Sequence, residues 1–75
     1  MMTLREWRAS RLMGTKALAA KAGVSNKTIV QIEHGRQVPN FGTMQKLSQA
    51  LDVEPMEVTE FAAAIEQRAA APAKD

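Results

Sequence analysis

The fold of this 75-residue chain is decided by one stretch, TKALAAKAGVSNKTIVQIEHG, which covers residues 15–35. Apolar residues recur at helical spacing on both sides of Gly23, and Gly35 follows the second run. A glycine just past a helix adopts positive φ at little cost, so each of these glycines marks a helix end. The stretch therefore predicts two short helices, about 15–22 and 26–34, joined by a tight turn.

Three further helices are predicted around this pair, and no segment shows the alternation expected of a strand. The first, about 4–12, follows Thr3, which forms a capping box with Glu6. The fourth follows Asn40, whose side chain suits an N-cap, as that of Ser25 does for the helix at 26–34. The fifth begins at Pro55, because proline is well tolerated in a first helical turn. We therefore expect an all-α fold, a compact domain of five helices.

The domain is expected to cover residues 1–68, with a disordered C-terminal tail at 69–75. Charge is unevenly distributed along it. Residues 1–46 carry eight basic and two acidic side chains, whereas residues 47–75 carry two basic and six acidic ones. The first part could therefore meet a polyanion while the second faces away from it, although solvated helix faces alone would also explain the pattern.

Composition argues against several classes of function. The chain has no cysteine and one histidine, so a disulfide framework, a thiolate zinc site and a Cys–His nucleophile pair are unavailable. The four glycines are spaced as helix ends rather than as a phosphate-binding loop. No apolar run approaches the ~20 residues of a membrane span. We expect a cytoplasmic, non-enzymatic protein with no cofactor, metal, small-molecule ligand or membrane partner.

Polar side chains occupy the outward side of the second helix in the deciding stretch, while Ile29 and Ile32 face inward. Amide side chains pair with adenine, lysine reaches guanine or phosphate oxygens, and valine contacts the thymine methyl group. An ordinary polar surface is the alternative, but the second helix of such a pair is where base contacts are made. The candidate base contacts are Asn26, Lys27, Val30 and Gln31.

A second set of residues is suited to the DNA backbone. Free N–H groups at the start of a helix attract phosphate, and Lys16 adds a charge there. Ordinary loop polarity is the alternative for Arg36 and Asn40, and interaction with the helix dipole is the alternative for His34. The candidate backbone contacts are Thr15, Lys16, Ser25, Thr28, His34, Arg36 and Asn40.

Residues 4 to about 59 resemble the Xre/Cro family, the lambda-repressor-like DNA-binding domains. The matching pieces are TKALAAKAGVSNKTIVQIEHGRQVP and TMQKLSQALDV, the second with Asp52 where glycine is usual. The resemblance implies a cytoplasmic protein of bacterial or phage-encoded type, which inserts its third helix into double-stranded DNA with Thr15 at a phosphate. It also implies an ion pair between Arg8 and Glu33 that ties the first helix to the third.

The fifth helix, about 55–70, is the segment through which the protein is expected to bind another protein chain. Phe61 and Ile65 extend its apolar face and either fold back on the first helix or meet a second copy. Family members usually dimerise through this end, so the resemblance favours a homodimer with Phe61 and Ile65 at its interface. We expect a sequence-specific transcriptional regulator, a dimeric repressor on an inverted repeat. The alternative is a protein-interaction module, such as an antitoxin or anti-activator, with its protein partner on helix 5.

Overall fold

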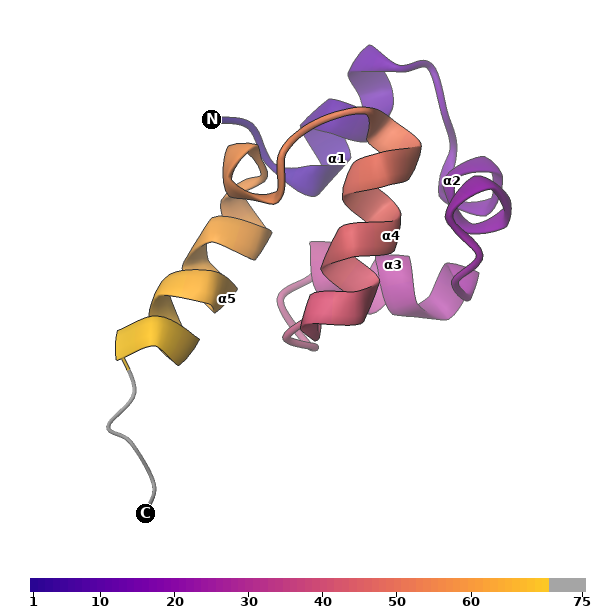
Figure 1. Ribbon diagram of the computed structural model, residues 1–75. Helices are drawn as coiled ribbons and strands as arrows, with labels where there is room; N and C mark the ends of the chain where they lie inside the picture. Colours follow the sequence, from indigo (N-terminus) through magenta and orange to yellow (C-terminus); the bar gives the residue numbers. More distant parts are fainter. Residues whose placement is uncertain (71–75) are drawn as a thin grey trace.

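Five α-helices and one 3-10 turn follow one another along the chain (Figure 1). The computed structural model describes the backbone of residues 1–70 and the side chains of residues 1–68. The elements are α1 (Leu4–Ser10), α2 (Thr15–Ala22), α3 (Asn26–Glu33), α4 (Phe41–Leu51), η1 (Pro55–Glu57) and α5 (Thr59–Ala70). Over the described residues the fold is all-α with five helices, so the predicted fold class is confirmed.

The helices enclose one apolar core. In Figure 1, α2 lies on one side of α4 and α5 leads away on the other side, while α3 runs behind the lower part of α4. Burying each large side chain of this core stabilises the fold by about 1.5–3 kcal/mol. The largest fully buried side chains are Leu4, Leu18, Ile29, Ile32, Met44, Leu47, Leu51, Val58 and Phe61.

Three predicted helix caps are confirmed. Thr3 and Glu6 form the capping box at the start of α1, with bonds of 2.8 Å and 3.1 Å. The Ser25 hydroxyl accepts a 3.1 Å hydrogen bond from the backbone N–H of Thr28 at the start of α3. The Asn40 side chain accepts in the same way at the start of α4. Each such cap contributes roughly 1 kcal/mol and determines where its helix begins.

Both glycines and side-chain-bearing residues adopt positive φ in the turns between helices. Gly23 and Gly35 have φ of 75° and 71°, as predicted for glycines that end helices. Leu12 and Asp52 also have positive φ, 57° and 59°, although neither is a glycine. A left-handed conformation costs a side-chain-bearing residue about 1–2 kcal/mol. Because Leu12 adopts it, α1 ends at Ser10 rather than at the predicted residue 12.

The predicted fifth helix is divided in two. Pro55 begins the short 3-10 turn η1, and Val58 then has extended geometry, with φ of −102° and ψ of 122°. The reason lies in the N-terminal segment, because Met2 forms a parallel β-bridge with Val58. The Thr59 N–H donates to the Met2 carbonyl at 2.9 Å, and the Met2 N–H donates to the Glu57 carbonyl at 3.3 Å. The helix α5 therefore begins only at Thr59.

Further hydrogen bonds hold α5 against α1. A Glu60 carboxylate oxygen accepts a 2.7 Å hydrogen bond from the Leu4 N–H, and the Trp7 indole N–H donates to the Glu57 carbonyl at 2.8 Å. Phe61 is completely buried in the same core cluster as Leu4. The prediction that Phe61 forms a dimer interface is therefore wrong, because its ring already completes the core of one copy.

The C-terminal end differs slightly from the predicted boundary. The backbone of α5 is helical to Ala70, two residues beyond the expected end of the domain at residue 68. Residues 71–75, the rest of the predicted tail, lie outside the described residues. None of the described helices has the length and apolar composition that a membrane span requires.

Candidate nucleic-acid interface

The turn between α2 and α3 is closed by backbone hydrogen bonds and by an apolar residue. The N–H groups of Gly23 and Val24 both donate to the Ala19 carbonyl, at 2.9 Å and 3.1 Å. The Val24 side chain packs against the core, and Ile29 and Ile32 bury the inner side of α3. These contacts fix the orientation of α3 relative to α2, as a helix-turn-helix requires.

The outer side of α3 follows from this burial. Lys27, Gln31 and His34 are spaced i, i+4 and i+7, so they share the side of the helix opposite Ile29 and Ile32. Lys27 and His34 are exposed, and Gln31 is half-buried. No internal side-chain hydrogen bond involves Lys27 or Gln31 among the described residues. Their polar groups therefore remain available to an external partner.

Val30 and Asn26 both lie beyond the same edge of this outer side. Both are half-buried. The Asn26 Oδ1 atom is buried and has no hydrogen-bond partner among the described residues. Of the four candidate base contacts, Lys27 and Gln31 thus lie squarely on the outer side, with Val30 beside them. Asn26 lies further round the helix, toward the rest of the domain.

An ion pair joins α1 to the end of α3. The Arg8 Nε atom lies 2.8 Å from Glu33 Oε2, and Arg8 Nη2 lies 3.0 Å from Glu33 Oε1. The remaining terminal nitrogen of Arg8 donates to the Met13 carbonyl at 3.1 Å. The Glu33 hydrogen bond raises the pKa of the Arg8 guanidinium above its usual value. The pair that the family resemblance implied is present in the structure.

The start of α2 offers unoccupied backbone donors. Its N-cap is Gly14, which has no side chain with which to accept a hydrogen bond. The N–H groups of Thr15 and Lys16 lie in the first turn, where no carbonyl of the helix can reach them. Lys16 is exposed beside them and Thr15 is half-buried. The combination of free N–H groups, the helix dipole and a lysine is suited to a phosphate.

The remaining candidate backbone contacts lie at both ends of α3. The hydroxyls of Ser25 and Thr28 are 2.7 Å apart and bond to each other, so only one of them keeps a free hydrogen. His34 is the exposed C-cap of α3, and Arg36 is exposed in the loop that follows. Asn40 uses its Oδ1 to cap α4, which leaves its amide N–H groups as donors.

Sequence reasoning missed an apolar groove between α4 and α5. The groove has a volume of about 390 Å³ and is lined by Phe41, Met44, Gln45, Pro55 and Ile65. Phe41 is 58% exposed, and the Arg68 guanidinium lies 4.9 Å from the centre of its ring. The i, i+3 spacing of Phe41 and Met44, together with the apolar character of Ile65, was the available sign. Ile65 remains a candidate for a partner surface because it is only half-buried.

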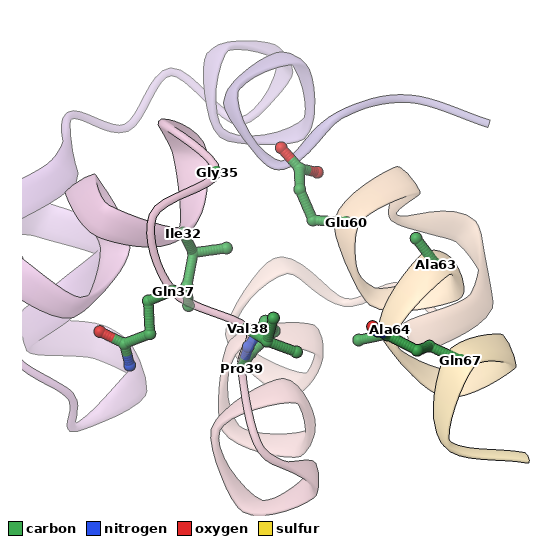
Figure 2. A pocket seen from close by; sticks show the side chains of 9 residues that line it. All are labelled: Ile32, Gly35, Gln37, Val38, Pro39, Glu60, Ala63, Ala64 and Gln67. Carbon is green, nitrogen blue, oxygen red and sulfur yellow. The ribbon is translucent and has the colours of Figure 1, made fainter. Parts of the chain in front are cut away.

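A smaller cleft separates the α3–α4 loop from α5 (Figure 2). Its volume of about 170 Å³ lies below the ~300 Å³ of ordinary small-molecule sites. Val38 and Ala64 face one another across it, whereas Glu60 points toward α1, whose first N–H it binds (Figure 2). Among the described residues, no three acidic, histidine or cysteine side chains group as a metal site would need.

A comparison with models of known protein families identifies the family to which this fold belongs. The model described as "Helix-turn-helix" matches residues 4–58, more than two thirds of the chain. The chain belongs to this helix-turn-helix family, of the Xre/Cro type, whose members are DNA-binding regulatory domains. The search of curated proteins and the search of solved structures each found no match.

Proposed function

We propose that the protein is a sequence-specific DNA-binding regulator of transcription that acts as a repressor. The observation that carries the proposal is the outer side of α3, where the side chains of Lys27 and Gln31 have no hydrogen-bond partner within the part of the chain that the structure describes. The closed turn at Gly23 and the Arg8–Glu33 pair hold this side in place. A helix held in this way is suited to the major groove, where its side chains meet base edges.

Phosphate contacts would supply most of the affinity. Lys16 at the start of α2 and Arg36 after α3 are exposed basic residues that flank the outer side of α3 along the chain. Each phosphate contact releases condensed counterions, so binding should weaken steeply as salt rises. Base contacts would then select the sequence, because phosphate contacts carry little sequence information.

We further propose that the protein binds DNA as a homodimer through the α4–α5 groove. The exposed Phe41 ring and the half-buried Ile65 form an apolar surface that one copy leaves partly uncovered. A two-fold dimer would place two copies of α3 in successive major grooves, ~34 Å apart, on an inverted repeat. Such a complex on a promoter would exclude polymerase, which supports repression as the outcome.

A titration of labelled duplex DNA tests the main proposal. Selection from a random pool first yields the preferred sequence, and affinity for it is compared with that for a scrambled duplex at physiological salt. The selected site should bind at least about 10³-fold more tightly than the scrambled one. Affinities of ~10⁻⁴–10⁻⁶ M for every duplex are the level of non-specific binding and would overturn the proposal.

The dimer is tested separately by sedimentation. Ile65→Glu and Phe41→Glu each place a charge in the groove and should yield a folded monomer. Leu12→Glu is the matched control, because Leu12 is 94% exposed and does not line the groove. That control should keep the mass of the dimer. An unchanged mass for both groove variants would contradict the dimer.

The same groove supports a second candidate function, a protein-interaction module. Its apolar lining would accept a side chain from a different protein as readily as one from a second copy. The two functions differ in their response to DNA. For an interaction module, the selected pool would show no consensus, while the Ile65→Glu variant would lose a protein partner.

A further inference from the structure

A polar pocket of about 290 Å³ lies where α4 ends and η1 begins. Three carboxylates and one half-buried apolar residue, Val53, belong to its lining. The lining residues are Ser48, Gln49, Asp52, Val53, Glu54 and Glu57. In the part of the chain that the structure describes, none of the three carboxylates forms a salt bridge with a basic side chain. The pocket therefore carries negative charge that no described residue neutralises.

The end of α4 adds to the negative potential of this pocket, because the C-terminus of a helix carries a partial negative charge. The basic side chain that reaches this end is Arg11, whose Nε donates to the Leu51 carbonyl at 2.9 Å. The Arg11 guanidinium also lies 5.2 Å from the centre of the Trp7 ring. Arg11 is thus held by a carbonyl and an aromatic ring rather than by the carboxylates of the pocket.

Ser48 provides a second and independent sign of a ligand. The residue is only 3% exposed, and its Oγ atom has no hydrogen-bond partner among the described residues. A buried hydroxyl without a partner is unfavourable, and native proteins leave few of them. Because Ser48 lines the pocket, a donor that fills the pocket lies beside this hydroxyl. The hydroxyl and the carboxylates all accept hydrogen bonds, so the group that suits them together is a cationic donor.

An arginine side chain meets these requirements better than a metal ion does. No three acidic, histidine or cysteine side chains of the described residues lie close enough together to hold a metal. A guanidinium presents five N–H donors in a planar fork and no acceptor, so it can bind carboxylates and a hydroxyl at once. Its aliphatic stem can lie against Val53. The volume of the pocket is just under the ~300 Å³ of ordinary small-molecule sites, which suits one side chain.

The pocket is remote from the helix that we propose enters the DNA groove. In Figure 1, α3 runs behind the lower part of α4, whereas the chain leaves the upper end of α4 toward η1. DNA bound at α3 would leave the upper end of α4 open, and the carboxylates there would repel phosphate groups. The position and the charge of the pocket therefore favour a protein partner over nucleic acid.

We propose that this pocket binds an arginine side chain of a partner protein. The carboxylates of Asp52, Glu54 and Glu57 hold the guanidinium, and the Ser48 hydroxyl accepts one of its hydrogen bonds. The site goes beyond the proposed regulation of transcription and does not depend on it, because no residue of α2 or α3 takes part.

A nuclear magnetic resonance titration of the full-length, ¹⁵N-labelled protein tests this proposal. The probe is a short blocked peptide with one arginine between glycines, and the same peptide with glutamine in place of arginine is its neutral control. The arginine peptide should shift the amide signals of residues 48–57 in a saturable way, and the glutamine peptide should not. Asp52→Asn should weaken binding by about 3-fold, as expected for one exposed ion pair. Asparagine also tolerates the positive φ at this position.

Two further variants separate the proposed site from general attraction between charges. Ser48→Ala should weaken peptide binding by about 3-fold or more, yet melt no lower than the wild type, because it removes an unpaired buried hydroxyl. Glu66→Gln is the matched control for Asp52→Asn, since Glu66 is exposed on α5 and does not line the pocket. It removes the same charge and should leave the affinity unchanged.

Three results would overturn the inference. The first is the absence of saturable shifts in residues 48–57, and the second is an equal loss of affinity for Glu66→Gln and Asp52→Asn. The third is a Ser48→Ala variant that binds the arginine peptide as tightly as the wild type does. Since the titration contains no DNA, each of these results leaves the proposed DNA binding untouched.

Discussion

Arg8 and Glu33 meet through two parallel hydrogen bonds of 2.8 Å and 3.0 Å, and Arg8 also holds the Met13 carbonyl. One side chain thereby fixes the last turn of α3 and the loop that leads into α2. Their side chains are 15% and 8% exposed, so solvent screens this pair less than it would a surface pair. The ion pair makes α1 part of the support for α3, the helix that we propose enters the DNA groove.

Breaking this pair should destabilise the fold strongly. Removing one partner of a buried ion pair costs about 3–5 kcal/mol, and the partial exposure here lowers the expected loss to about 2–3 kcal/mol. Urea denaturation of Arg8→Met and Glu33→Leu measures each loss. The double variant should lose clearly less than the sum, because no charge is then left unpaired. Strictly additive losses would show that the two residues do not interact.

Leu12→Gly should stabilise the protein by about 0.5–1 kcal/mol. Leu12 has φ of 57° and is 94% exposed, so glycine relieves the left-handed strain and removes no buried surface. Thermal unfolding measures the gain. Leu12→Ala is the control, because alanine keeps the β-carbon that causes the strain. Equal melting temperatures for the alanine and glycine variants would contradict this explanation.

Gly14→Ser and Gly14→Asp should separate stability from DNA binding. A β-carbon at Gly14 meets nothing within 4 Å, and φ of −77° suits any residue. Either side chain can cap α2 and should stabilise the fold by about 0.5–1 kcal/mol. The serine variant should bind DNA as the wild type does. The aspartate variant should bind more weakly, because its charge repels a phosphate at the start of α2. Filter-binding titrations in low salt compare them, and equal affinities would argue against a phosphate there.

Phe61→Ala should destabilise the fold by about 3–5 kcal/mol, since the ring is fully buried. A domain of this size is stable by only about 4–11 kcal/mol in total, so the loss is a large part of the whole. Ile65→Ala removes a half-buried side chain and should cost less than about 2 kcal/mol. Chemical denaturation at low protein concentration compares the two. A smaller loss for Phe61 than for Ile65 would contradict the burial order.

Local features of the fold were predictable from the sequence, because they depend on a few neighbouring residues. Capping by Thr3, Ser25 and Asn40 and the positive φ of Gly23 and Gly35 are of this kind. Such features require only the hydrogen-bonding groups and steric freedom of residues close together in the chain.

The features that were missed depend on residues far apart in the chain. The division at Val58 arises from the bridge to Met2, and the burial of Phe61 arises from the return of α5 to the core that holds Leu4. Arg11 likewise reaches the Leu51 carbonyl at the end of α4, 2.9 Å away. Periodicity within one helix carries no information on such contacts, so the apolar face of the fifth helix could not be divided between core and partner surface.

At the interface, the outward position of Lys27 and Gln31 followed from helical spacing alone. The buried carbonyl of Asn26 did not, since spacing places a residue on a side of a helix without deciding how its amide turns. The Arg8–Glu33 pair came from the family resemblance rather than from spacing, because 25 residues separate its members.

The hydrogen bond from the Trp7 indole to the Glu57 carbonyl gives the protein an optical reporter. Trp7 is the only tryptophan of the chain, and the Arg11 guanidinium lies 5.2 Å from the centre of its ring. Its fluorescence therefore responds to the junction between α1 and η1 without any label. A change in emission on dimerisation or DNA binding would show that the surroundings of Trp7, next to the N-terminal end of α5, change when the protein binds its partner.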